Sequence, residues 1–446
     1  MSAALEARID EWRDHVDRAH GLRPGETEEL EAHLREQIDA LRQAGLDEDE
    51  AFLIGVKRLG AIDAISREFA RANSARLWKQ LLPADDAAAA GPTNRRDLGV
   101  TGAFALLAGV LVLGLDLATP GGALTAFPIA APSLAIAVLA AWLLQRRGAG
   151  ARVWLAALGW IAVPTAIALA YPFGMASGSL PLTLIHLPVF AWFGAGIAYL
   201  GGRWRGRVME FVRFSGEIAI YYLLIALGGG VLITLIAGIL QPLLPGALGA
   251  LMQWWVPALA AGALVVAAWL VEAKQSVIEN LAPVLAAVFT PLFAIATVVA
   301  AVVYAIGGLG GPFDRDLLLA FDVLLLLVTA LGLYRLSARD PRRPAGVIDV
   351  AALVATLGSL ALDLIELWAL AERIGDLGWT ANRVAALGLN LLLVVVLVGA
   401  AVLGIRMLAT RGTSAPLERW HTAVLPAYAA WALLVAVVLP PVFGFA

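Results

Sequence analysis

Apolar runs of about 20 residues recur from Leu98 to the end of the chain, and they limit the possible folds more than any other feature. Each run is long enough to cross the hydrocarbon core of a bilayer as one helix. Only 15% of the residues are charged, against roughly 25% in ordinary soluble domains. The sequence therefore predicts an all-α, polytopic transmembrane helix bundle.

We expect about eleven spans in this bundle. Pro128, Pro132, Pro257, Pro283 and Pro291 lie in or beside the apolar runs, and a proline can kink or break a helix, so the count holds to within one. The predicted spans are 98–118, 126–145, 152–171, 180–200, 217–240, 249–271, 281–306, 314–335, 347–371, 380–404 and 420–442.

Basic residues gather in alternate loops between these spans. If the amino-terminal region lies in the cytoplasm, the loops on that side hold most of the Lys and Arg residues of the membrane region. The opposite loops hold only Arg315, Arg373 and Arg383. Because short cytoplasmic loops are enriched in Lys and Arg, we expect a multi-pass protein with a cytoplasmic N-terminus and an external C-terminus.

Residues 1–80 are charged and predict a small soluble helical domain, joined by a linker at 81–97 to the transmembrane domain at 98–446. Asp47 and Glu50 have the spacing of a capping box at the start of one helix. The domain is acidic, and phosphate neutralisation needs a basic surface, so we expect no direct nucleic-acid binding. It is either a solvated cap or a docking module for another protein. Apolar residues at helical spacing predict four helices, marked by Ile9, Trp12 and Val16; Leu30, Leu34, Ile38 and Leu41; Phe52, Val56 and Leu59; and Ile62, Ile65 and Phe69.

Two short patterns in this domain carry a family resemblance. They are the stretch Gly-Leu-Asp-Glu-Asp-Glu-Ala at 45–51 and Arg-Leu-Gly at 58–60. Residues 26–72 resemble the permease prefix domain, a helical signalling domain at the amino end of bacterial membrane proteins, whose genes often neighbour PadR-like transcriptional regulators. The resemblance implies a bacterial inner-membrane protein with a PadR-like regulator as a possible partner of residues 1–80.

A second resemblance involves the turn Gly-Trp-Thr-Ala-Asn-Arg at 378–383 and the segment 272–281, which we expect to be a loop facing the cytoplasm. Residues 216–410 resemble a polytopic bacterial membrane family, domain of unknown function family 4153. That resemblance implies an integral inner-membrane protein and no established activity. Independently of it, Thr380 is expected to cap the helix that follows.

Three carboxyl groups lie inside apolar spans: those of Asp322, Asp363 and Glu366. Ionisable residues in a span are costly and mark a functional site by default. Counting about 1.5 Å per residue, Asp322 and Asp363 lie at one depth, roughly 12 Å below the outer surface. Asn390 falls at about the same level, and Glu366 lies one turn nearer the outside on the face of Asp363.

Two interpretations of these residues stay open. The first is an outward-open polar pocket that binds a cation, a proton or a polar ligand, since two carboxylates held close in a low dielectric cannot both stay ionised cheaply. The second is a structural network in which Arg373 or Arg383 neutralises the carboxylates. The candidate pocket residues are Asp322, Asp363, Glu366, Asn390 and Arg383.

The sequence offers no catalytic motif. It has neither a Walker loop nor a Gly-x-Ser-x-Gly elbow. There is no cysteine, and three of the five histidines (His15, His20 and His33) belong to the soluble domain, so no zinc constellation forms. His186 stands alone in the outer half of its span and is typical of a packing residue. We therefore expect no enzyme activity, no cofactor and no metal.

Two functions fit these observations. In the first, the protein is a membrane sensor that couples the outer pocket to a cytoplasmic partner through residues 1–80. In the alternative, it is a secondary transporter or ion-coupled permease that uses Asp322, Asp363 and Glu366. A structural scaffold within a larger complex stays a third option, and so does an oligomer.

Overall fold

The computed structural model describes two compact units, Met1–Asn94 and Arg95–Ala446. Helices make up most of the described residues, and no strand occurs among them. This confirms the all-α fold. The described residues are 3–20, 26–43, 46–59, 95–119, 125–174, 177–204, 206–240, 246, 249, 251–273, 275–306, 315–339 and 345–445.

The first unit contains helices α1 (Ala3–His20), α2 (Glu26–Gln43) and α3 (Glu48–Leu59). As the capping pattern predicts, the Oδ1 atom of Asp47 accepts a hydrogen bond from the backbone N–H of Glu50 at 2.7 Å. The predicted fourth helix and all of the predicted linker except 95–97 lie outside the described residues. The core of the unit consists of the predicted apolar positions and their neighbours: Leu5, Ile9, Trp12, Leu34, Ile38, Leu41, Ala51, Phe52 and Val56.

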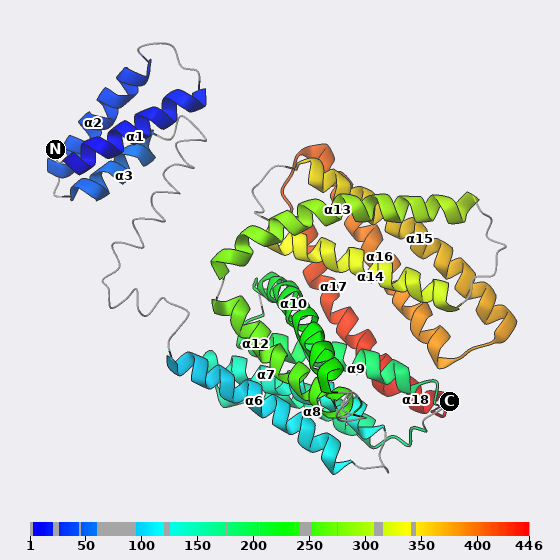
Figure 1. Cartoon of the computed structure of the whole chain (residues 1–446). Helices are drawn as coiled ribbons and strands as arrows, with labels where there is room; N and C mark the ends of the chain where they lie inside the picture. Colours follow the sequence, from blue (N-terminus) through cyan, green and yellow to red (C-terminus); the bar gives the residue numbers. More distant parts are fainter. Residues whose placement is uncertain are drawn as a thin grey trace. The chain divides into compact units, whose positions relative to one another are not determined.

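The second unit is the membrane body (Figure 1). Among its described residues, eleven segments are long and apolar enough to cross a membrane, which confirms the predicted number of spans. Its helices are α6 (Arg95–Ala118), α7 (Ala126–Arg146), α8 (Ala151–Leu169), α9 (Leu180–Leu200), α10 (Val208–Leu240), α12 (Val256–Ala273), α13 (Gln275–Ile306), α14 (Arg315–Ala338), α15 (Val347–Leu377), α16 (Ala381–Thr410), α17 (Ala415–Leu433) and α18 (Leu439–Val442), with π-helical turns at Leu251–Trp255 and Leu434–Val438.

The prolines do not change the number of spans. Pro132 lies inside α7, and Pro283 and Pro291 lie inside α13, which continues through both. Pro257 is the second residue of α12, which directly follows the π-helical turn Leu251–Trp255, so the span continues through this proline as well.

Several predicted boundaries are wrong, and two of them lie at polar stretches. The expected loop at 272–281 is mostly helix, because α12 ends at Ala273 and α13 already begins at Gln275. The predicted span from 217 also starts too late, since α10 begins at Val208 and buries Phe211 and Phe214. Both errors have one cause: polar residues end an apolar run, but without Pro or Gly they do not end a helix.

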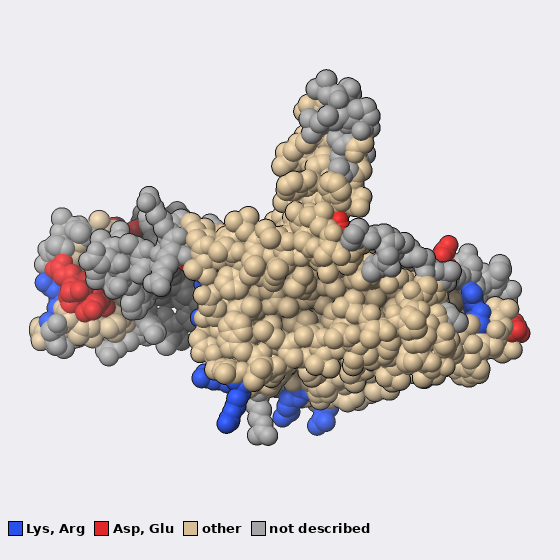
Figure 2. Space-filling view, turned by 90° about the horizontal axis from the view of Figure 1, so that it is seen from below, with Lys and Arg blue, Asp and Glu red and all other residues tan. Residues whose placement is uncertain are grey.

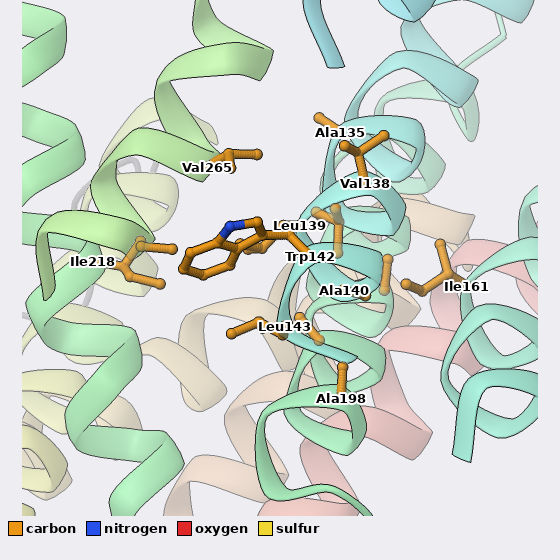
Figure 3. Packing of buried hydrophobic residues seen from close by; sticks show 14 of the residues in the cluster. Ala135, Val138, Leu139, Ala140, Trp142, Leu143, Ile161, Ala198, Ile218 and Val265 are labelled. Carbon is orange, nitrogen blue, oxygen red and sulfur yellow. The ribbon is translucent and has the colours of Figure 1, made fainter. Parts of the chain in front are cut away.

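One side of the membrane body has a continuous apolar core. It is formed by α6 to α9, α12 and the first turns of α10, which we call the apolar half. The indole of Trp142 lies at its centre, near Ile218 of α10 and Val265 of α12 (Figure 3). Its Nε1–H donates a hydrogen bond to the Oγ1 atom of Thr101 at 3.3 Å. Side chains therefore fill the centre of this half, and the indole N–H of Trp142 there has a hydrogen-bond partner.

The other side contains α13 to α17, which we call the polar half; α17 also packs against α9 (Figure 1). Two indole rings of α17 pack directly against glycines of α16. A Cβ atom on Gly388 would lie 2.0 Å from the ring of Trp431, and one on Gly399 would lie 2.2 Å from the ring of Trp420. The Nε1–H of Trp420 donates to the carbonyl of Val396 at 3.1 Å, so α16 and α17 are closely joined.

Several helix ends of the membrane body are held together by ion pairs of arginine. Arg146 pairs with Asp97 and Glu272, which links α7 to α6 and α12, while Arg339 pairs with Asp349 and links α14 to α15. We call these the arginine-rich ends. Figure 2 shows that Lys and Arg side chains of the body project mainly along one edge, whereas most of the visible surface is uncharged. Such a surface suits contact with a lipid bilayer.

Candidate functional site

Four of the five predicted site residues meet inside the polar half. Asp322 comes from α14, Asp363 and Glu366 from α15, and Asn390 from α16. The Nδ2 atom of Asn390 donates hydrogen bonds to Oδ1 of Asp322 at 3.1 Å and to the carbonyl of Ala386 at 3.0 Å. The carboxyl groups of Asp322 and Glu366 lie within hydrogen-bonding reach of each other. We call these four residues the carboxylate cluster.

The helical spacing explains how the cluster forms. Asp363 and Glu366 are three residues apart, so both side chains lie on one face of α15. Asp322 lies two turns into α14, and Asn390 lies on α16, which packs along α15. The depth comparison made from the sequence therefore identified residues that are neighbours in space.

Three of the four cluster residues are fully buried and Asp322 is partly exposed, which corrects the expectation of an outward-open pocket. The exposed fractions of Asp363, Glu366 and Asn390 are 0%, 1% and 0%. Both carboxyl oxygens of Asp363, Oε2 of Glu366 and Oδ1 of Asn390 are buried without a hydrogen-bond partner. α15 runs six residues beyond its predicted end, to Leu377. The cluster thus holds more acceptor atoms than donors.

Arg383 is not part of the cluster. Its guanidinium Nη1 donates hydrogen bonds to the carbonyls of Leu377 at 2.9 Å and Gly378 at 2.6 Å, at the end of α15. Its backbone N–H bonds Oγ1 of Thr380, which confirms the predicted cap of α16. Within the described residues, the charged groups that act on Asp363 and Glu366 are other carboxylates. A network neutralised by Arg383 does not form.

Tyr428 of α17 completes the cluster, and the sequence reasoning missed it. The phenol lies close enough to Asp363 for the two groups to interact electrostatically, and its hydroxyl is buried without a partner. Its position seven residues after His421, on the same face of α17, is the only signal that the sequence contains. His186 lies elsewhere: its Nδ1 bonds the carbonyl of Leu182 in its own helix at 2.9 Å.

A cavity of about 60 Å³ lies between α13, α14, α15, α16 and α17, at their arginine-rich ends. We call it the arginine cavity. Its wall includes Arg335 and Asp349, whose Nη1 and Oδ1 atoms are 2.6 Å apart. His421, with an exposed fraction of 8%, and Thr290 also line it. The Nδ1 atom of His421 and the Oγ1 atom of Thr290 have no hydrogen-bond partner.

Unpartnered polar atoms are concentrated in the polar half. Eleven described residues of the membrane body contain buried side-chain atoms without a partner, and all but Ser133 belong to α13–α17. Proteins satisfy nearly all their buried polar groups, and exceptions mark missing waters or ions, or functional sites. Among the described residues, no three His, Asp or Glu side chains are arranged to hold one metal ion. The polar half therefore offers room for water, protons or a singly charged cation.

No known protein family, curated protein or solved structure matches this chain. Both family resemblances therefore stay predictions.

Proposed function

We propose that this integral membrane protein binds protons or a monovalent cation at the carboxylate cluster and uses them as a cation-coupled permease. The observation that carries the proposal is the burial of the carboxyl groups of Asp363 and Glu366 with unpartnered oxygens, in a cluster that contains a third carboxyl group, that of Asp322. An ionised carboxylate without a partner costs several kcal/mol in an apolar interior. Each group must therefore hold a proton or share a cation.

The position of the cluster favours coupling to transport. The three carboxyl groups come from two neighbouring helices, α14 and α15, and the amide of Asn390 joins a third. Binding or release of a cation changes the charge shared by these helices, so it changes how they pack. Intramembrane carboxylates of this kind form the ion and proton sites of many pumps and transporters.

Carbodiimide labelling of the full-length protein tests whether the cluster carries protons. Carbodiimides react with protonated carboxyl groups in apolar surroundings, so at neutral pH we expect labelled peptides that contain Asp363 or Glu366. Glu217 provides a matched internal control, because it is also buried but pairs with Arg213 at 2.9 Å and should stay unlabelled. Labelling that Na⁺, K⁺ or Li⁺ suppresses would identify a cation in place of the proton. Equal absence of label from the cluster and Glu217, whatever the cation, contradicts the proposal.

A flux measurement tests the permease itself. We expect proteoliposomes that contain the protein to take up protons or a solute when a cation gradient is imposed, and we expect Asp363→Asn to remove that uptake. A matched variant is Glu217→Gln, which alters a buried carboxyl group outside the cluster. If Asp363→Asn leaves every flux at the level of the unaltered protein, transport through the cluster is refuted.

A sensor is a second candidate, and the separate folding unit at the amino end favours it. Helices α1–α3 enclose a core of their own. Arg35 of this unit pairs with Glu6 at 2.8 Å and Glu31 at 2.9 Å, so charged side chains cover its outside. In this role the unit lies in the cytoplasm of a bacterial cell and contacts a regulator of the PadR-like type. Retention of a co-produced regulator by the full chain, and its loss in Asp363→Asn, would support the sensor over the permease.

A further inference from the structure

We propose that protons reach the carboxylate cluster from the arginine cavity, along Ser359, Tyr428 and water molecules between α15 and α17. The inference rests on the proposed function, in which the cluster carries protons. It adds the route by which they arrive and the end of the protein from which they enter.

The burial of Asp363 and Glu366 makes a route necessary. Their exposed fractions are 0% and 1%, and only Asp322 of the three carboxylates is partly exposed, so protons need carriers to reach Asp363 and Glu366. The arginine cavity lies along the same helices, and it is lined by residues of α15 and α17 as well as α13, α14 and α16. Protons entering there need carriers over the remaining length of α15.

Polar residues lie on one face of α15 between the arginine cavity and the carboxylate cluster. Asp349, Thr356 and Asp363 are spaced seven residues apart, so they lie on one face of the helix. Asp349 and Thr356 line the cavity. Ser359 lies between Thr356 and Asp363, about 5 Å from one and about 6 Å from the other along the helix axis. Its hydroxyl is fully buried and has no hydrogen-bond partner.

A second line on α17 leads to the same place. His421 lines the cavity, and Tyr428, two turns further along, packs against the apolar cluster that contains Leu362, the neighbour of Asp363, and interacts electrostatically with Asp363. Both residues contain a buried polar atom without a partner. Two helices therefore each place an unpartnered polar group between the cavity and the cluster.

The volume of the arginine cavity and the polar atoms that line it are both suitable for water molecules. A cavity needs roughly 10–15 Å³ to hold one water molecule, and each buried water needs two to four polar partners. The arginine cavity has about 60 Å³, and His421 and Thr290 offer such partners. Water there and beside Ser359 would satisfy atoms that otherwise lose hydrogen bonds on burial.

The proposed steps are proton transfers only. A hydroxyl or a water molecule accepts a proton on oxygen and releases another from the same oxygen to the next carrier, and the last proton joins a carboxylate oxygen. Nothing is oxidised or reduced. The described charged and titratable groups that face His421 are Arg335 of α14 and Asp349 of α15, which pair with each other. Asp363 is the titratable group that interacts with Tyr428.

Hydrogen–deuterium exchange of the carboxyl groups, followed by infrared spectroscopy on the full chain in nanodiscs, tests the route. The carbonyl band of a protonated carboxyl group shifts when deuterium replaces its proton. We expect Ser359→Ala and Tyr428→Phe each to slow this shift about tenfold, the effect of removing one buried hydrogen-bonding group. The matched controls are Ser133→Ala, a buried unpartnered serine of the apolar half, and Tyr222→Phe, whose hydroxyl bonds the carbonyl of Ala260. They should exchange as the unaltered protein does.

The outcomes distinguish a failure of the proposed function from a failure of the proton route alone. If the unaltered protein shows no band of a protonated carboxyl group, the claim that the cluster carries protons fails. If the band is present and both Ser359→Ala and Tyr428→Phe exchange at the original rate, the route is wrong. Circular dichroism verifies folding, and Ser359→Ala, which removes one oxygen, decides the matter if Tyr428→Phe does not fold.

The end from which protons enter has its own test, because the natural chain contains no cysteine. Met407→Cys places a single thiol in the wall of the arginine cavity. We expect a membrane-impermeant thiol reagent to modify it and to slow carboxyl exchange about tenfold. Val265→Cys, in the fully buried core of the apolar half, should stay unmodified. Failure of the cavity thiol to react, or exchange unchanged after its reaction, overturns entry through this cavity.

Discussion

Replacing Asp363 by Asn and measuring the stability tests whether the carboxyl group of Asp363 is neutral or ionised in the folded protein. The exposed fraction of Asp363 is 0%, and neither of its oxygens has a partner. If the native carboxyl group is neutral, the amide is nearly the same shape and equally neutral. The change in the free energy of unfolding should then stay within about 1 kcal/mol. If Asp363 were the anion of a buried ion pair, its loss would cost about 3–5 kcal/mol.

Asn390→Leu provides the comparison. Asn390 is also fully buried, and its Nδ2 atom donates to both Asp322 and Ala386. Leucine removes both bonds and leaves Oδ1 of Asp322 without that donor. Each of the two lost bonds is worth about 1 kcal/mol, and a stranded acceptor adds roughly 1–3 kcal/mol, so we expect a loss of about 3–5 kcal/mol. Asn390→Leu should therefore destabilise the membrane body more than Asp363→Asn.

Unfolding by a graded mixture of denaturing and mild detergent, at pH 7 and with linear extrapolation, measures both variants. The circular dichroism signal follows the helices, and tryptophan fluorescence follows the packing. The reasoning is refuted if Asp363→Asn loses 3 kcal/mol or more, or if it is less stable than Asn390→Leu. Either result would mean that Asp363 is an ionised structural residue with a partner.

Three further predictions concern other parts of the chain. Trp142→Ala should cost about 3–5 kcal/mol in the same unfolding assay, because it opens a large cavity in the apolar half. Gly388→Ala should cost about 1–3 kcal/mol, since the added Cβ would lie 2.0 Å from the indole of Trp431. The hydrogen bond from Arg35 lowers the pKa of Glu6 below its ordinary value of 4.5, and desolvation opposes this shift without outweighing it. The stabilisation from this pair should be present above pH 4.5 and lost as the pH falls through the lowered pKa, and Glu6→Gln should flatten this loss in an acid titration followed by circular dichroism.

The spans and most of the cluster could be predicted from the sequence because they depend on local quantities. The length of an apolar run decides whether a helix crosses the bilayer. Counting residues from the ends of neighbouring spans placed Asp322, Asp363 and Asn390 at one depth, and the hydrogen bond between Asn390 and Asp322 shows that they meet. The depth of a residue in the membrane follows from its position along the span, so the sequence predicts it directly.

The direction in which a side chain points around its helix axis cannot be predicted in the same way. Arg383 was a predicted neutralising partner of the carboxylates, yet its guanidinium bonds the carbonyls that end α15. Tyr428 was missed because a tyrosine in an apolar span is ordinary, and only the packing of α17 brings it to Asp363. Burial of most of the cluster could not be foreseen either, since it depends on how α14, α15 and α16 fit together.

The division of the membrane body into two halves has a mechanical consequence. Nearly all the unpartnered polar atoms of the described membrane body lie among α13–α17, together with a cavity of about 60 Å³. Side chains fill the core around Trp142, and a cavity of about 210 Å³ lined by charged residues that include Arg213 and Glu217 lies beside it. Hydrostatic pressure favours states in which internal voids are eliminated. Because unpartnered polar atoms can bind the water that enters, compression should disturb the α13–α17 side before the core around Trp142, so that this core remains rigid while the other half changes.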